Sequence, residues 1–423
     1  MKWPTVPIRI IAPPMPAKIK FEPNESIWHL SLDQIESDTG LIISKKYAGL
    51  QDAGSSTFFF DTGNVLYSKL RPYLNKVTIP DQPGIATTEL IPLRPNIKVL
   101  DPKFLAYYLR SKNFVNQASH HVAGAKMPRV IMDWFWEHEI PLASLIEQHR
   151  IVEILDEADR LRRLRREADA KAARILPVLF LKMFGDPATN PMGWDLTTIG
   201  NVTSAIDYGT STKSSDDGSG MPLIRMGNVD YNGHLDLRNL KHIQLSESEV
   251  ARFRLWDGDI LFNRTNSKEL VGKTGLWDVD IEALAASYFI RIRVDCEQVT
   301  PTFFWAFMNC SYMKKVLRLT ARGAIGQANI NSSELRALVM YKPPLDQQHL
   351  FTNRWKQIRA TIPQRVSDQT DLDSLFATLL QRAFSGQLTA KWREAHGKEL
   401  LAEMEQQARL LNLPLPKEPE TTP

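Results

Sequence analysis

A long helical segment that occurs twice is the feature that most constrains the fold of this 423-residue chain. The first copy runs over residues 142–184, and its outline returns at a gapless offset of two hundred positions. The matched pairs are Leu145 and Leu345, Gln148 and Gln348, His149 and His349, Leu179 and Leu379, and Phe184 and Phe384. Because each copy follows a segment of mixed α/β character, the repeat predicts a duplicated molecule.

The first copy carries an apolar ladder whose members alternate steps of three and four residues. The ladder consists of Ile151, Ile154, Ala158, Leu161, Ala168, Ala172, Ile175 and Leu179, and Arg165 is its one break. This spacing predicts a coiled-coil seam, which needs a partner helix. The second copy supplies one, and antiparallel pairing of the two would relate the two globular domains by a pseudo-two-fold axis. Pro177 and Pro363 should kink the two helices or start their last turns anew.

Basic side chains lie between the seam positions of the first copy. They are Arg160, Arg162, Arg163, Arg166, Lys171 and Arg174. One reading is a solvated flank of the coiled coil. The other is a docking surface for an acidic partner or for DNA passing alongside, and the sequence favours neither.

The repeat extends into the segments that precede the helices. The stretch "GDILFNRTNSKELVGKTGLW" matches "GNVLYSKLRPYLNKV", and "RGAIGQANIN" matches "AGAKMPRVIM". We therefore expect an α+β protein with two similar mixed α/β domains separated by two long helices that form an antiparallel coiled coil. The expected boundaries are a first domain at 1–143, a first helix at 144–186, a second domain at 187–342, a second helix at 343–386 and a tail at 387–423.

Composition excludes several classes of protein. A hydrophobic content of 43% with 24% charged residues is ordinary for globular domains. The net charge of +4 permits a nucleic-acid partner without requiring one. Two cysteines, Cys296 and Cys310, disfavour a disulfide scaffold and a thiolate zinc site. The proline-broken first residues do not read as a signal peptide, and no apolar run approaches the roughly 18–20 residues of a membrane span, so we expect a soluble, cytoplasmic protein.

Catalytic motifs are missing from the sequence. The stretch "SKELVGKT" approaches a phosphate-binding P-loop, but Ser267 stands where that motif requires glycine and "GLW" after it reads as a strand. We find neither a methyltransferase cofactor loop, nor an Asn/Asp-Pro-Pro-aromatic motif, nor a two-carboxylate nuclease cluster. The nine histidines lack metalloprotease spacing. We expect no catalysis and no metal site in this chain.

Basic, amide and aromatic residues recur instead at Gly-marked loop tips. In the second domain they are Tyr208, Thr210, Ser211, Lys213, Arg225, Asn228, Arg264, Asn266, Lys268, Lys273, Arg322, Gln327 and Asn329. In the first domain they are Lys45, Lys46, Tyr47, Lys69, Arg71, Tyr73, Asn75, Lys76, Lys126 and Arg129. Arg and Lys match the acceptors of guanine, Asn and Gln match the edge of adenine, and Lys, Ser and Thr bind phosphates. Any one such residue is more often a solvated surface group, but recurrence at matching places predicts two DNA-binding surfaces.

An ordered set of motifs resembles the specificity subunits of type I restriction–modification systems. These motifs are "GDILFNRTNS" with "VGKTGLW" at 258–277, "GAIGQANIN" at 323–331, "PPLDQQH" at 343–349, "LPVLFLKMFGDP" at 176–187 and "AFSGQLTAKWRE" at 383–394. The resemblance covers the chain to about residue 395. The first domain departs from the family pattern, because "KLRPYLNKV" and "AKMPRVIM" replace the hairpin and loop motifs of the second.

The resemblance implies a non-catalytic DNA-specificity subunit with two target recognition domains and an antiparallel helix pair. It implies double-stranded DNA as a partner, together with methyltransferase subunits, two in number, and restriction/translocase subunits. S-adenosylmethionine, ATP and Mg would be bound by those partners and not by this chain. A coiled-coil scaffold with protein-binding globular ends is the alternative.

Two non-identical domains on a rigid rod also predict an asymmetric, bipartite DNA target with an unread spacer. We hypothesise that the helix pair sets the spacer length. We also hypothesise that the hairpin at 264–273 and the loop at 327–329 read the second half-site.

Overall fold

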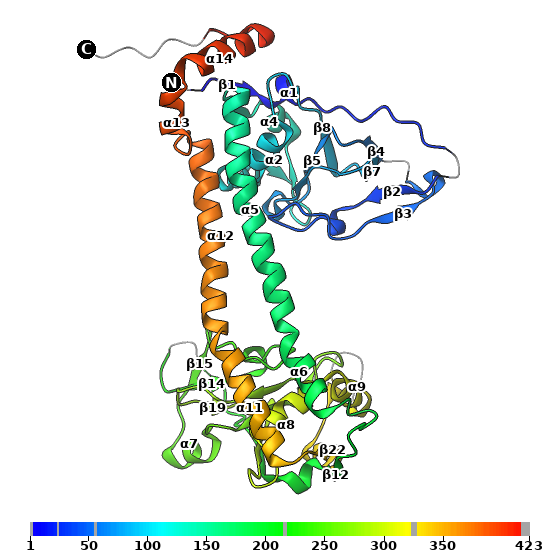
Figure 1. Cartoon of the computed structure of the whole chain (residues 1–423), viewed down its shortest axis with the longest axis vertical. Coiled ribbons are helices and arrows are strands. Elements are labelled where there is room, and N and C mark those ends of the chain that lie inside the picture. The colour runs from blue at the N-terminus through cyan, green and yellow to red at the C-terminus, as the bar shows by residue number, and fades with distance from the viewer. Residues whose placement is uncertain (1–2, 23–24, 55–56, 215–217, 323–327, 416–423) are drawn as a thin grey trace, which may run out of the picture. The chain divides into compact units, whose positions relative to one another are not determined.

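The computed structural model describes residues 3–22, 25–54, 57–214, 218–322 and 328–415, and Figure 1 draws its elements. The chain divides into two compact units. Unit 1 comprises Met1–Arg166 with Ser367–Pro423, and unit 2 comprises Glu167–Val366. Each long helix therefore contributes one part to each unit.

Unit 1 combines a four-stranded sheet, a three-stranded sheet and two separate strand pairs with short helices. Its strands are β1 (Thr5–Pro7), β2 (Ile27–Leu30), β3 (Lys46–Ala48), β4 (Thr57–Phe60), β5 (Val65–Ser68), β6 (Val77–Thr78), β7 (Gly84–Thr87), β8 (Leu90–Leu93), β9 (Val122–Ala123), β10 (Arg129–Val130) and β11 (Glu139–Pro141). Its helices are α1 (Ile8–Ile11), α2 (Pro102–Arg110), α3 (Lys112–His120), α4 (Met132–Glu137), the first part of α5 (Leu145–Ala173), most of α12 (Ile362–Phe384), α13 (Ala390–Ala395) and α14 (Gly397–Leu411). The sheets have the orders β3-β2-β7-β4 and β6-β5-β8, and the two-stranded pairs are β1-β11 and β10-β9.

Unit 2 repeats this plan. Its strands are β12 (Asp195–Thr198), β13 (Thr203–Tyr208), β14 (Met221–Ile224), β15 (Lys241–Ile243), β16 (Ile260–Asn263), β17 (Thr265–Asn266), β18 (Thr274–Leu276), β19 (Leu284–Ala285), β20 (Phe289–Val294), β21 (Ala328–Asn329) and β22 (Val339–Lys342). Its helices are the end of α5, α6 (Ile175–Phe184), α7 (Glu247–Phe253), α8 (Pro301–Asn309), α9 (Ser311–Thr320), α10 (Ser332–Ala337) and α11 (Leu345–Ala360). The main sheets have the orders β13-β20-β16-β18 and β15-β14-β19.

The repeated glutamines Gln148 and Gln348 make the same hydrogen bonds in the two units. Gln148 Oε1 accepts from the backbone N–H of Asp101, and its amide donates to the carbonyl oxygens of Val99 and Ala143 at 2.8 Å. The equivalents in unit 2 are the N–H of Thr300 and the carbonyls of Gln298 and Pro343. Asp101 and Thr300 are the N-caps of α2 and α8. Both glutamines are fully buried, and a side chain that is shielded from solvent must satisfy its donors and acceptor within the protein. Because the two side chains do so through equivalent partners, the predicted duplication is confirmed.

Both long helices break where the prolines predicted a break. α5 ends at Ala173 and α6 begins two residues before Pro177, while α11 ends at Ala360 and α12 begins one residue before Pro363. A proline lacks the N–H that would bond the carbonyl four residues earlier and crowds that carbonyl, so the helix starts anew.

The predicted apolar seam is wrong over the middle of the first helix. Ile151 is buried, but Leu161 and Ile175 expose 42% and 48% of their surface. Ion pairs join the helices there instead. In unit 1, Arg165, the break in the apolar ladder, reaches Asp368 at 2.9 Å, and Arg162 reaches Asp373 at 2.7 Å.

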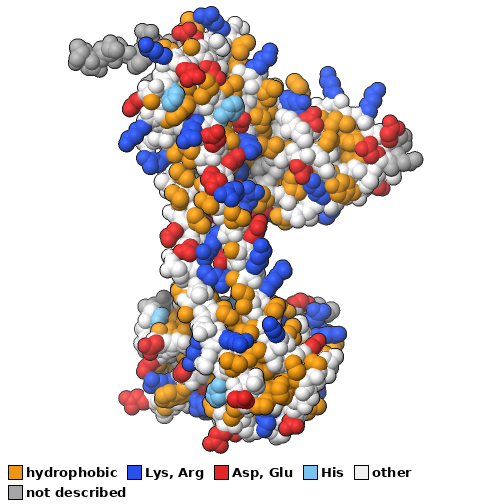
Figure 2. Space-filling view, viewed as in Figure 1, with side chains coloured by type: hydrophobic (Ala, Val, Ile, Leu, Met, Phe, Trp, Pro, Cys, Tyr) orange, Lys and Arg blue, Asp and Glu red, His pale blue; other side chains and the backbone are white. Residues whose placement is uncertain are grey.

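The ion pairs also fix the direction of the helix pairing. Within unit 1 the partner number falls from 373 to 368 as the first helix advances from 162 to 165, so the pairing is antiparallel. Within unit 2, Arg365 pairs with Asp169 at 2.9 Å. The Arg162 guanidinium also lies 4.3 Å from the centroid of the Phe376 ring. Charged side chains of both signs are interleaved along the helices in Figure 2, so the first helix does not present a uniformly basic face.

No helix in the described part of the chain is both long and apolar enough to span a membrane. Among the same residues, no three His, Cys, Asp or Glu side chains are grouped so that they could hold a metal ion.

Candidate nucleic-acid interface

Two short strands of unit 2 bring predicted site residues from distant parts of the sequence together. β17 pairs antiparallel with β21, so that Thr265 lies opposite Asn329 and Asn266 opposite Ala328. Arg264, immediately before β17, donates to Asn329 Oδ1 at 3.3 Å, and its carbonyl accepts from the N–H of Ile330 at 2.9 Å. The hairpin and the loop that were predicted to act together therefore meet at this junction.

Tyr208, at the end of β13, joins the same junction. The Arg264 guanidinium lies 4.9 Å from the centroid of the Tyr208 ring, an arrangement in which a cation is attracted to the π face. The Tyr208 hydroxyl accepts from the backbone N–H of Ser332 at 3.1 Å. The tyrosine keeps 42% of its surface exposed. It thus offers a fixed aromatic edge beside two polar side chains.

Arg322 lies at the edge of this junction. Its backbone exchanges hydrogen bonds with Asn329 at 2.8 and 3.1 Å. Its side chain is 83% exposed and pairs with Glu334 at 2.7 Å, which neutralises part of its charge. Gln327, predicted as a base contact, lies outside the described residues.

A polar cavity of about 660 Å³ adjoins the junction. Five predicted residues line it, namely Thr210, Ser211, Lys213, Arg225 and Asn228. Arg225 Nε is buried and has no hydrogen-bond partner among the described residues. A guanidinium nitrogen left in this state is a strong donor available to an incoming acceptor.

Sequence reasoning missed Ser287 and Tyr288, which connect the cavity to the junction. The Ser287 carbonyl accepts from Arg264 Nε at 3.1 Å, and its N–H donates to the Thr210 carbonyl at 2.7 Å. Tyr288 is 42% exposed and lines the cavity. Both lie directly before β20, and an aromatic residue at the turn before a strand was a usable signal in the sequence.

Two predicted site residues of unit 2 are buried and make hydrogen bonds within the domain. Asn228 is 6% exposed and donates from Nδ2 to the Asp236 carbonyl at 2.9 Å. Lys273 is 9% exposed, and its Nζ donates to the carbonyls of Met226 and Val229. Burial lowers the pKa of Lys273. Lys268 is exposed and lines a different cavity, behind the hairpin.

Unit 1 builds an equivalent junction with different residues. Val130 N–H donates to the Lys69 carbonyl at 2.9 Å, as Ile330 N–H donates to that of Arg264. Leu70 bridges to Arg129, as Thr265 pairs with Asn329. Lys69 therefore takes the place of Arg264, and Arg129 that of Asn329.

Acidic neighbours hold several of the predicted cations of unit 1. Arg129 pairs with Glu89 at 2.7 Å, Lys45 with Asp81 at 2.7 Å, and Lys46 with Asp33 at 2.8 Å. The hydrogen bond from Lys46 lowers the pKa of Asp33 to about 2. Lys45 also lies over the Trp28 ring.

The remaining candidates of unit 1 fall into three groups. Asn75 and Lys76 donate to the backbone carbonyls of Arg110 and Leu32, so they brace the fold. Tyr47 is 52% exposed, and its hydroxyl accepts from Gln82. Lys69, Arg71 and Lys126 have no carboxylate partner among the described residues. Arg71 is exposed and has φ of +50°, while its N–H donates to the Pro128 carbonyl at 2.7 Å.

Comparison with known proteins gives one consistent result. The family model described as "Type I restriction modification DNA specificity domain" matches residues 36–171. The chain is 27% identical over 344 residues to the type I restriction enzyme EcoKI specificity subunit of Escherichia coli (strain K12), covering 75% of this chain and 72% of that protein. It is 28% identical over 343 residues to the StySPI specificity subunit of Salmonella potsdam, with coverage of 75% and 72%.

Solved structures agree at the level of the fold. A chain from a structure described as addressing complex assembly and conformational transition of the type I R-M system aligns with a TM-score of 0.58 at 19% identity, covering 92% of this chain and 98% of that one. The type I restriction–modification S subunit from M. genitalium aligns with a TM-score of 0.51 at 15% identity, with coverage of 90% and 96%.

Proposed function

The chain belongs to the family of type I restriction–modification DNA specificity subunits, and from this premise we propose that it recognises an asymmetric bipartite DNA target. Members of this family recognise DNA and carry no catalytic activity. In our proposal each unit reads one half-site, and the chain tethers methyltransferase and restriction/translocase subunits to the bound DNA. Two methyltransferase subunits bind per chain, and S-adenosylmethionine, ATP and Mg are bound by the partners.

The observation that carries the proposal is the repeated junction. Lys69 with Val130 in unit 1 and Arg264 with Ile330 in unit 2 form the same backbone hydrogen bond at 2.9 Å. The side chains around that bond differ, with Arg129 in one unit where Asn329 stands in the other. Arginine suits guanine and asparagine suits adenine. One scaffold with two sets of side chains supports two different half-sites.

The acidic partners of Arg129, Lys45 and Lys46 reduce the contribution of these cations to the affinity of unit 1 for DNA. A cation already paired with a carboxylate gains less from a phosphate, because the carboxylate must be displaced or tolerated. Lys69, Arg71 and Lys126, which have no carboxylate partner in the described part of the chain, therefore supply the main electrostatic attraction there. Counterion release from DNA makes that attraction sensitive to salt.

The test is a filter-retention assay with the full chain and its methyltransferase subunits. Duplexes carrying both half-sites are compared with duplexes that carry one half-site and a scrambled other half. We expect retention of the bipartite duplex well above that of either single half, at a salt concentration that removes non-specific binding. Retention that ignores sequence would favour a scaffold whose globular ends bind protein.

A further inference from the structure

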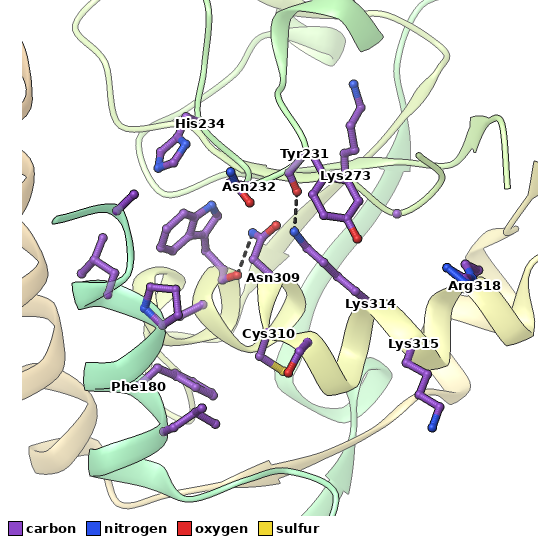
Figure 3. A pocket seen from close by; sticks show the side chains of 18 of the residues that line it. Phe180, Tyr231, Asn232, His234, Lys273, Asn309, Cys310, Lys314, Lys315 and Arg318 are labelled. Carbon is purple, nitrogen blue, oxygen red and sulfur yellow. Dashed lines mark hydrogen bonds between the residues drawn. The ribbon is translucent and has the colours of Figure 1, made fainter. Parts of the chain in front are cut away.

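A cavity of about 630 Å³ lies in unit 2 behind the recognition hairpin. It is enclosed by α6, by α8 and α9, and by the loop around Tyr231 (Figure 3). Its apolar wall includes Leu176, Phe180, Trp305, Ala306 and Phe351. Its volume falls within the roughly 300–1,000 Å³ that is usual for small-molecule sites.

At the matching positions of unit 1, large side chains pack against one another. The Tyr107 ring lies 6.3 Å from that of Phe376, and the Arg110 guanidinium lies 5.5 Å from the Tyr107 centroid. Arg110 also donates to the Asp38 carbonyl. These three side chains are packed against one another.

Unit 2 replaces all three with smaller side chains. The N-caps Asp101 and Thr300 place Ala306 where unit 1 has Tyr107 and Asn309 where it has Arg110. The helix repeat places Leu176 at the position of Phe376. All three replacements line the cavity. The cavity therefore lies where the two otherwise similar units differ in side-chain size.

Cations outnumber acids around the cavity. The lining includes Lys268, Lys273, Lys314, Lys315 and Arg318, against Glu269 as the acid. Lys273 is held by two carbonyls. Lys314 donates to the Tyr231 carbonyl and lies 3.8 Å from the centroid of its ring. Burial lowers the pKa of Lys314, and an anion beside it would oppose that shift.

The wall also carries an unused acceptor. The Asn309 amide nitrogen donates hydrogen bonds to the carbonyl oxygens of Thr274 and Trp305, at 2.8 and 3.0 Å. Asn309 Oδ1 is buried and has no hydrogen-bond partner among the described residues. A buried acceptor in this state is costly and is satisfied by an incoming N–H group.

We propose that this cavity binds a nucleoside phosphate, which departs from the expectation, implied by the resemblance, that ATP is bound by the partner subunits and not by this chain. The base lies against Phe180 and Trp305 and offers an amino group to Asn309 Oδ1, while the phosphates meet Lys314 and Arg318, which are one helical turn apart on α9. The site is not a P-loop, because Thr274 begins strand β18 and not a helix. Since Lys268 and Lys273 line the cavity from the hairpin, the ligand braces the back of the segment that carries Arg264.

The test uses the purified full chain without its partners and measures ATP binding by titration calorimetry, with adenosine and pyrophosphate as separate probes. We expect one ATP per chain, weaker binding of adenosine and none of pyrophosphate. The double variant K314A/R318A should weaken ATP binding by about tenfold or more and leave adenosine binding nearly unchanged. A306Y, which introduces the residue of the matching position 107, should abolish binding of both.

K112A, which removes an exposed lysine from the matching helix of unit 1, is the control and should leave ATP binding unchanged. Thermal unfolding verifies that each variant folds, and retention of bipartite DNA should persist in A306Y, so failure of this site is distinguishable from failure of DNA recognition. Absence of ATP binding at millimolar concentration would overturn the proposal. So would undiminished binding by folded A306Y, or pyrophosphate binding as tight as that of ATP.

Discussion

The guanidinium of Arg264 lies over the ring of Tyr208, 4.9 Å from its centroid. This contact joins the end of β13 to the start of β17, and the hydrogen bond from Arg264 to Asn329 extends it to β21. Three loop tips are thereby locked together. A base-reading surface needs such support, because a contact that is loose by an ångström loses much of its selectivity.

Asn329→Ala should weaken discrimination in one half-site only. Asn329 is exposed, and the variant removes an amide that matches the adenine edge. We therefore expect the difference in binding free energy between the correct base and a wrong base at one position to decrease by about 1–3 kcal/mol. The loss should change little with salt, since no phosphate contact is removed. Binding competition with single-base variants of the target measures it. Arg129→Ala is the matched variant in unit 1 and should alter the other half-site, whereas equal losses in both halves would point to misfolding.

Lys69→Ala should weaken DNA binding more than Lys46→Ala. Lys69 has no carboxylate partner among the described residues, whereas Lys46 is paired with Asp33. We expect Lys69→Ala to reduce the slope of log affinity against log salt by about 1, uniformly across sequences. Retention measured at several salt concentrations gives that slope. Equal effects of the two variants would mean that the Asp33 pair does not withhold Lys46 from DNA.

The repeat and the helix breaks could be predicted from sequence because each rests on local information. A fixed offset can be counted directly in the sequence, and a proline breaks a helix at its own position. The prediction of an apolar seam is wrong at Leu161, because counting steps of three and four residues treats every aliphatic residue at a seam position as buried. Whether it is buried depends on the opposing helix, which presents Asp368 and Asp373 to Arg165 and Arg162. Those pairs follow only once the antiparallel register is known.

The site was predicted in part for a similar reason. Tyr208, Arg264 and Asn329 follow strand ends, and such positions converge at one edge of a domain. Lys273 shares that sequence context, yet it turns inward because the carbonyls of Met226 and Val229, more than forty positions away, approach it. Local composition does not reveal a tertiary contact of this kind.

Glu147→Ala should strongly destabilise unit 1. The carboxylate is fully buried and accepts from Trp3 Nε1 at 2.9 Å, Thr389 Oγ1 at 2.6 Å and Arg393 Nε at 2.7 Å. Its removal leaves the mostly buried Arg393 unpaired, which costs about 3–5 kcal/mol. Gln347→Ala, at the matching position of unit 2, is the control and should cost far less. Urea unfolding compares them, and a similar loss in both variants would contradict this role of Glu147.

His138 should make the stability of unit 1 depend on pH. Burial, assisted by the charge of His121, lowers the pKa of His138 from 6.5 to about 4. Between these values the unfolded chain binds a proton that the folded chain does not, so the free energy of unfolding falls as pH decreases from 6.5 towards 4. His138→Gln should flatten that dependence, measured by urea unfolding across the window. His349→Gln, at an exposed position, is the control, and an unflattened curve in His138→Gln would refute the assignment.

The most direct test of the account alters the helix pair and maps the modified bases. Matched insertions of four residues, one in α5 between Asp156 and Lys171 and one at the opposing level of α12, add about 6 Å of helix. Cells expressing the variant with its methyltransferase subunits are then analysed by modified-base sequencing. The account predicts two unchanged half-sites separated by a longer spacer. An unchanged spacer, or a motif without two separate blocks, would contradict it.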